Sequence, residues 1–215
     1  MKSIYKKSWF IIAALVFASI QQLSAQTLKD FFKSPDVPLT YLGIDYTQAK
    51  ILNELGGNPN DVRDRQFAGM NQVVIQEVKK YDLTKVFDRP NITNDLSFVT
   101  AKNAKIDADK IFENSSDEVR FKNTTIESIV KGYDFGSKKG IGFLIVMESM
   151  NKTSAQASMY VTFVDMASRK VLYTERMTGK AGGIGFRNYW IKPVFFVFEE
   201  IRKSKYDDWK EANAK

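Results

Sequence analysis

Residues 140–150 read GIGFLIVMESM, an apolar run in which Glu148 is the only ionisable residue. A strand that is apolar on both of its alternating faces has to be covered on both, so this segment is expected at the centre of a sheet. Residues 157–165 and 170–178 are rich in Val, Tyr, Phe and Thr, and a four-residue loop separates them. The three segments together predict a three-stranded antiparallel meander.

Two amphipathic helices are predicted to cover this sheet. In the first, over about 61–81, apolar residues recur every three or four positions, and Asn58 or Asn60 is the expected N-cap. The second runs over about 187–203. Its Pro193 is compatible with a helix only in the first turn, where a missing N–H costs nothing.

The rest of the chain predicts shorter elements. Residues 39–45 (LTYLGID) predict a first strand. A short helix with a threonine start is expected to end at Gly132. Residues 83–121 have a weaker pattern: we expect a strand near 97–100, while 106–112 is compatible with either a strand or a helical turn.

The order of these elements predicts the fold class. Helices have to cover a mixed sheet to bury its apolar face, so we expect one layered α/β domain over 39–215, whose sheet ends in the antiparallel meander. A chain of this length with 16 Phe can bury enough apolar surface to fold as one unit.

The first 25 residues have the pattern of a cleaved export signal. A basic start with three lysines precedes the 12-residue apolar run 9–20, and a polar break ends at Ala25. A membrane-spanning helix needs about 20 apolar residues, so the run is too short to span, although retention as an anchor stays the alternative. We therefore expect an exported protein, periplasmic or extracellular, with a lead-in segment over 26–38.

The chain contains no Cys and no His. Without a thiol, lipoprotein anchoring and disulfides are excluded. The same absence excludes Ser-His-Asp and Cys-His catalysis, iron–sulfur clusters and most zinc and copper sites, and we expect no metal and no cofactor. The formal charge of +7 falls to +4 without the first 25 residues and their three lysines. The basic residues form small separate groups and no aromatic-basic motif is present, so nucleic acid is not an expected partner.

The order of elements resembles that of the curli-secretion lipoprotein family and of the amino-terminal domain of the Tol-system periplasmic protein. The resemblance rests on residues 39–45, on the segment 140–178 with its hairpin sequence DMASRKVL, and on the closing helix. It implies an envelope domain that binds or assembles with other components. It implies no secretion pore, because the chain has neither a lipid-bearing Cys nor amphipathic hairpins that insert as a barrel. The sequence GGIGFRNYW is also similar to exported bacterial proteins of unknown function.

Three carboxylates are the weak catalytic candidates that remain. Asp45 closes the first predicted strand, Glu148 interrupts the central one and Asp165 ends the next. Two carboxylates roughly 5 to 10 Å apart across a cleft can hydrolyse a glycosidic bond. The structural alternatives are that Asp45 caps a turn, that Glu148 pairs with Lys170 or Arg176, and that Asp165 is an ordinary hairpin residue.

Two segments are candidates for binding. The glycine-rich connection 179–185 precedes the last helix, where free N–H groups favour anions, although a turn that needs positive φ explains the glycines equally. The aromatic residues of the C-terminal tail either dock on the domain or contact a partner. The candidate contact residues of these two segments are Gly182, Gly183, Gly185, Arg187, Tyr206 and Trp209.

The sequence therefore predicts a non-enzymatic envelope protein that binds another envelope protein or an anionic ligand. The alternative is a carboxylate-dependent hydrolase of envelope glycan or peptide. That alternative requires Asp45 and Glu148 within reach of each other in a cleft, whereas a filled core and an exposed apolar patch favour binding.

Overall fold

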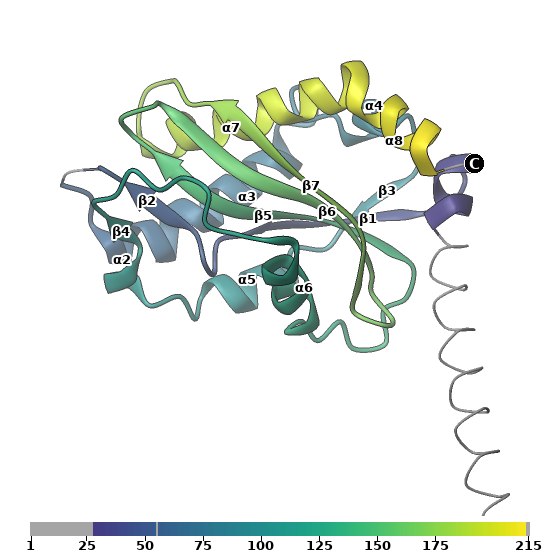
Figure 1. Ribbon diagram of the computed structural model, residues 1–215, viewed down its shortest axis with the longest axis horizontal. Coiled ribbons are helices and arrows are strands. Elements are labelled where there is room, and N and C mark those ends of the chain that lie inside the picture. Colours follow the sequence, from purple (N-terminus) through teal and green to yellow (C-terminus); the bar gives the residue numbers. More distant parts are fainter. Residues whose placement is uncertain (1–27, 55, 214–215) are drawn as a thin grey trace, which may run out of the picture.

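A mixed β-sheet organises the part of the chain that the computed structural model describes, residues 28–54 and 56–213 (Figure 1). Its central strand is β5 (Ile141–Asn151), in which every residue is buried. Along one edge β5 pairs antiparallel with β6 (Gln156–Asp165), and β6 pairs antiparallel with β7 (Lys170–Lys180). The predicted export signal, residues 1–25, lies outside the described residues.

Two short strands share the other edge of β5. The first half of β5 pairs in parallel with β1 (Leu39–Asp45), and its last residues pair in parallel with β2 (Lys50–Leu52). β3 (Ile92–Asn94) extends the sheet beyond β1, and β4 (Phe112–Glu113) extends it beyond β2, again in parallel. The sheet is therefore interrupted on this side at residues 46–49.

Helices cover both faces of the sheet (Figure 1). One face carries α3 (Phe67–Gln76), α4 (Leu83–Val86) and α7 (Phe186–Glu200). The other carries α5 (Ser97–Asn103) and α6 (Asn123–Lys131), which bury a second, smaller apolar cluster. The predicted α/β class, with a mixed sheet covered by helices, is confirmed. Within the described ranges, no helix has the length and apolarity needed to cross a bilayer.

The first predicted helix is shorter and less regular than its periodicity indicates. It consists of α2 (Pro59–Asp61), a π-helical turn (Val62–Gln66) and α3. Asn58 is the N-cap, and its side chain accepts from the backbone N of Asn60 and Asp61 at 3.0 and 3.2 Å. The helix ends at Gln76, because Glu77 leaves the helical region at φ −86° and ψ 53°. Val78 lies beyond this end, although the apolar periodicity over 61–81 predicts it in the buried stripe, and it is 60% exposed.

The strand predicted at residues 97–100 is wrong, since these residues form the first turn of α5. Asp95 starts the helix: its Oδ1 accepts from the backbone N of Ser97 at 3.2 Å and from its hydroxyl at 2.6 Å. The β-branched Val99 and Thr100 favour a strand locally, but Val99 is fully buried in the second apolar cluster. Residues 106–112 contain a 3₁₀ turn (Ala108–Lys110) and the first residue of β4.

Pro193 lies in the middle of α7, and the prediction that it occupies the first turn is wrong. Proline has no N–H, so the carbonyl of Tyr189, four residues earlier, loses its helical donor. The backbone N of Gly182 donates to this carbonyl at 3.2 Å instead. A Cβ on Gly179 would lie 2.3 Å from the Pro193 carbonyl oxygen, so glycine lets β7 approach the helix closely.

Arg89 joins the lead-in segment to the rest of the domain. Its side chain is buried, and its guanidinium donates to the carbonyls of Ser34 and Val37 at 2.9 and 2.8 Å and to that of Phe31. It also lies 3.6 Å from the centre of the Phe31 ring. The helical part of the lead-in segment, residues 28–33, thereby belongs to the core. Burial of the Arg89 guanidinium lowers its pKa.

The C-terminal helix packs beside this lead-in segment (Figure 1). α7 continues through a π-helical turn (Ile201–Lys205) into α8 (Tyr206–Asn213). The Tyr206 ring lies 5.9 Å from that of Phe32 and 5.6 Å from that of Phe87, between centroids. The segments at the two ends of the described chain are therefore held in one aromatic cluster.

We expect Arg89→Met to lower the free energy of unfolding by about 3 kcal/mol, because three carbonyls lose a charged donor inside the core. Urea denaturation measures this loss. The control is Arg202→Met, which removes only an exposed ion pair with Glu199 at 2.9 Å and should leave the urea midpoint unchanged. An equal loss in both variants would contradict the role assigned to Arg89.

Candidate functional site

Asp45 is fully buried at the carboxyl end of β1, and both of its oxygens accept hydrogen bonds. Oδ1 accepts from the backbone N of Thr47 at 2.7 Å and from its hydroxyl at 2.5 Å. Oδ2 accepts from the Tyr133 hydroxyl at 2.5 Å. Burial, together with the Asp45 charge, raises the pKa of Tyr133. Asp45 therefore caps a turn, as the structural alternative predicts, and it also binds Tyr133 in the segment after α6.

Glu148 is also fully buried and forms a separate network. Its Oε1 accepts from the backbone N of Arg120 and Phe121 at 2.7 and 2.8 Å. Its Oε2 accepts from Arg176 Nε at 2.6 Å, so Arg176 rather than Lys170 is the partner. The carboxylate therefore fixes the segment before α6 against the sheet.

Asp165 has the ordinary role of a hairpin residue. Its carboxylate accepts from the backbone N of Ala167 at 3.0 Å and from the Ser168 hydroxyl at 2.7 Å. The three predicted acids thus belong to three networks, and every oxygen of Asp45 and Glu148 accepts from a protein donor. This geometry gives no support to the hydrolase alternative. Across residues 28–54 and 56–213, no group of three acidic side chains is arranged to hold a metal ion.

Tyr206 and Trp209, predicted as binding residues, are core residues of α8 and only 5% and 3% exposed. The Trp209 indole N–H donates to Glu175 Oε2 at 2.7 Å, and Lys205 Nζ donates to Glu175 Oε1 at 2.6 Å. The tail therefore docks on β7. A partner cannot reach the two aromatic rings unless α8 detaches, so the structure removes them from the candidate site.

The glycine-rich connection remains the best placed of the predicted binding segments. Gly183 and Gly185 have φ of 117° and 80°, so the turn does require positive φ. The N–H of Gly182 is used within the fold, by the Tyr189 carbonyl. Gly185 is the N-cap of α7, and no side chain caps the helix start. At the tip of the connection, Ile184 is 92% exposed.

We call residues 182–187 of this connection, together with the start of α7, the glycine loop. An open hollow of about 520 Å³ lies beside it. One wall is the start of α7, with Arg187; the other is the end of the π-helical turn and the start of α3, with Arg65 and Gly69. A Cβ on Gly69 would lie 3.2 Å from Arg187 Cδ, so glycine leaves room for the arginine stem. Arg65 is paired with Asp61 at 2.6 Å, whereas Arg187 has no carboxylate partner among the described residues.

A second site, at the carboxyl end of β1, was not predicted from the sequence. Two adjoining hollows of about 460 and 480 Å³ share Thr47, Ile106 and Asp107. The first lies between α5 and the segment after α6, and the second between β2 and the start of α6. We call the pair the β1 groove. The only sequence signal for it is that Asp45 ends a parallel strand.

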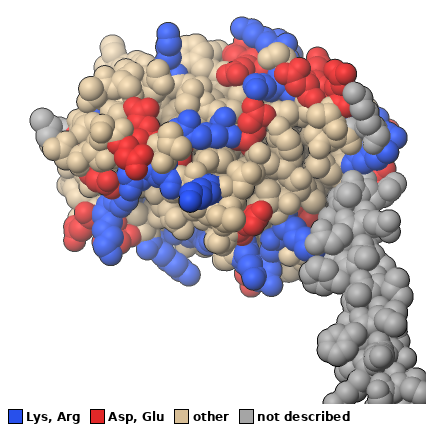
Figure 2. Space-filling view, in the orientation of Figure 1, with Lys and Arg blue, Asp and Glu red and all other residues tan. Residues whose placement is uncertain are grey.

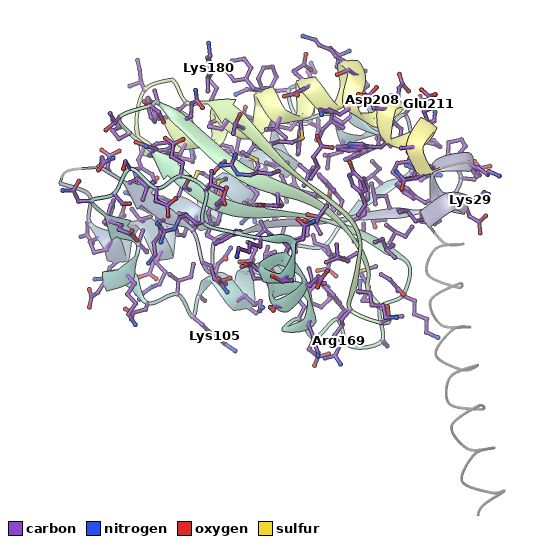
Figure 3. All side chains as sticks on the ribbon, viewed as in Figure 1. Lys29, Lys105, Arg169, Lys180, Asp208 and Glu211 are labelled. Carbon is purple, nitrogen blue, oxygen red and sulfur yellow. The ribbon has the colours of Figure 1, made fainter. Side chains whose placement is uncertain are left out.

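The two sites lie on different sides of the sheet. Figure 3 places Lys180, at the end of β7 next to the glycine loop, opposite Lys105 of the β1 groove. On the face shown in Figure 2, basic and acidic side chains are interspersed and form no single stripe. Each site is therefore a local feature and not part of one charged surface.

Glu148→Gln should lower the free energy of unfolding by about 2–3 kcal/mol, because Arg176 loses its anionic partner inside the domain. Denaturant unfolding measures the change. Asp165→Asn is the control, since its acceptor serves only a surface hairpin, and its effect should be much smaller. A Glu148→Gln variant as stable as the wild type would contradict a structural ion pair.

The docking of α8 should weaken in acid. Burial raises the pKa of Glu175, but hydrogen bonds from Lys205, Tyr173 and Trp209 outweigh it, so the pKa lies below its ordinary value. A carboxylate with a lowered pKa stabilises the fold above its unfolded pKa of about 4.3, and this contribution is lost as pH falls through the folded pKa. We expect Trp209 fluorescence to shift to the red below about pH 4.

Glu175→Gln is the control for this acid transition. The glutamine cannot titrate, so the Trp209 signal should then lose its pH dependence in this range. A shift of the same size in both proteins would show that another group causes it.

Comparison with known proteins finds no family model that matches the chain and no curated protein with significant similarity to it. The resemblance to the curli-secretion and Tol-system proteins stays a prediction from the order of elements.

Proposed function

We propose that this protein is a non-catalytic component of the cell envelope that binds another envelope component through the glycine loop. The observation that carries the proposal is that Ile184, 92% exposed, stands beside Arg187 and an uncapped helix start. The envelope location rests on the export pattern of residues 1–25.

The electrostatics of the glycine loop favour an anionic group on the partner. The first N–H groups of a helix point out along its axis, and its dipole places partial positive charge there. Arg187 adds a full positive charge at the same end of α7. A carboxylate of the partner would accept from both.

The apolar tip of the loop favours a protein partner. A fully exposed isoleucine at a loop tip gains free energy when a partner covers it. We therefore propose a partner segment in which an acidic side chain lies next to an apolar contact. The engagement of Asp45 and Glu148 by protein donors supports binding over hydrolysis.

Arg187→Glu should weaken retention of the partner about tenfold, since it reverses the charge that the partner's acid would contact. The measurement compares wild-type and variant protein as baits in envelope extracts, with mass spectrometry of each retained protein. Lys139→Glu is the matched control, because it makes the same charge change before β5, at the opposite end of the sheet. Equal retention by wild type and Arg187→Glu would overturn the proposal.

Gly183→Val separates the turn from the binding surface. Its φ of 117° is strained for valine, so we expect a loss of about 1–3 kcal/mol in stability whether or not a partner is present. Thermal unfolding measures this. Arg187→Glu should leave the melting temperature unchanged, and a loss there would mean that its binding defect reports misfolding.

A further inference from the structure

The β1 groove lies where the parallel side of the sheet is interrupted. β1 ends at Asp45 and β2 begins at Lys50 on the same edge of β5, so the carboxyl end of β1 opens into the groove. In open α/β sheets, ligands bind outside the carboxyl ends of parallel strands, at breaks in the strand order. The position therefore favours a binding site, and the charges and contacts of the groove decide which kind.

Two buried asparagines bind the backbone at the end of β1, just before the groove. Beyond Tyr41, none of the described strands pairs with the outer edge of β1, because β3 pairs only with residues 39–41. Asn71 of α3 takes the place of a strand: Ile44 N donates to its Oδ1 at 2.7 Å, and its Nδ2 donates to the Ile44 carbonyl at 3.1 Å. Asn103 of α5 accepts from Tyr46 N at 2.9 Å.

These bonds fix the backbone that leads into Thr47, which lines both halves of the groove. The two bonds that Thr47 donates to the Asp45 carboxylate then close the turn. A site whose backbone is already fixed pays less ordering entropy when a ligand binds.

Basic residues outnumber acidic residues in the lining. The five basic residues are Lys50, Lys102, Lys105, Lys110 and Arg120, and the two acidic residues are Asp107 and Asp134. Lys110 is paired with Asp107 at 2.8 Å, and Arg120 is paired with Glu113 at 3.0 Å. The charges of Lys102 and Lys105 have no carboxylate partner among the described residues.

Lys102 is oriented without being neutralised. Its Nζ donates to the Ile129 carbonyl at 3.3 Å and lies 4.1 Å from the centre of the Tyr133 ring. Both contacts leave its positive charge in place, and an ammonium has further N–H donors for a ligand. Lys105 stands free at the rim, where Figure 3 shows it projecting into solvent.

The same half of the groove has an apolar side. Phe98 and Ile106 are both half-buried and line it together with the two lysines and Thr47. A ligand that uses the whole hollow would combine an anionic group with an apolar part. We propose that the β1 groove binds a phosphate ester, with its phosphate at Lys102 and Lys105 and its organic part against Phe98 and Ile106.

The test uses phenyl phosphate as the probe, titrated into the whole protein by calorimetry. We expect saturable binding to the wild type, and about tenfold weaker binding to Lys102→Gln/Lys105→Gln, because the phosphate loses both ammonium groups. Lys33→Gln/Lys203→Gln is the control, since it removes the same charge outside the groove. No saturable binding to the wild type, or equal binding to both double variants, would overturn the proposal.

Two further measurements keep the result interpretable. Lys105→Gln alone changes an exposed side chain, so it should weaken binding of phenyl phosphate without lowering the melting temperature. If binding is lost only in variants that also unfold, the proposal is overturned. Ile106→Ser should weaken phenyl phosphate more than inorganic phosphate, because only the former has an organic part to contact residue 106. Equal effects on both would contradict the assigned orientation.

The source of the phosphate is distinguished by vesicles. If the ligand is a lipid headgroup, the protein should sediment with phosphatidylglycerol vesicles but not with phosphatidylcholine vesicles. Phenyl phosphate should then compete with the phosphatidylglycerol vesicles and release the protein. Binding of phenyl phosphate without vesicle sedimentation would identify a soluble ester. Arg187→Glu should bind the probe as the wild type does, so failure at the glycine loop and failure at the β1 groove are separate outcomes.

Discussion

The burial of β5 is the constraint on which the rest of the structure depends. All of its residues are buried, so each face of the sheet needs a cover, and the chain supplies a separate set of helices for each. Its two edges are occupied as well, by β6 on one side and by β1 and then β2 on the other. Both candidate sites lie where this cover stops: after the end of β7, and in the gap between β1 and β2.

The same burial determines the role of Glu148. A carboxylate inside a covered strand has to find donors, and an irregular segment with free backbone N–H groups provides two of them. Arg176 provides the opposite charge. The acid that interrupts an apolar strand in the sequence is therefore the point at which a loop is fastened to the sheet.

Elements with a long, uniform pattern could be predicted from the sequence, and elements determined by distant contacts could not. Residues 140–150 predict β5 closely, because a strand that is apolar on both faces has to lie at the centre of a sheet that is covered on both sides. Residues 97–100 look like a strand locally, yet the carboxylate of Asp95 and the apolar cluster against β1 make them helical. Of the candidate sites, the glycine loop has a local signal before a helix. Its second wall on α3 comes from a segment far away in the sequence, so no local pattern marks it. The β1 groove combines three separate segments, within 47–50, 97–111 and 120–134, and Asp45 at the end of β1 is its only sequence signal.

The cluster around Arg89 has a consequence for the order of folding. Phe32, near the start of the described chain, packs on Tyr206, near its end. Arg89 donates to carbonyls of the same lead-in segment. Contacts so far apart in the sequence form only after most of the chain has been made, and closing such a long loop is slow. Phe31 and Phe32 also pack on Phe163 of β6, but until α8 is in place the side of Phe32 that contacts Tyr206 stays uncovered. The last helix is therefore the piece that completes the core, and a chain that stops short of it would expose the apolar surface on which aggregation begins.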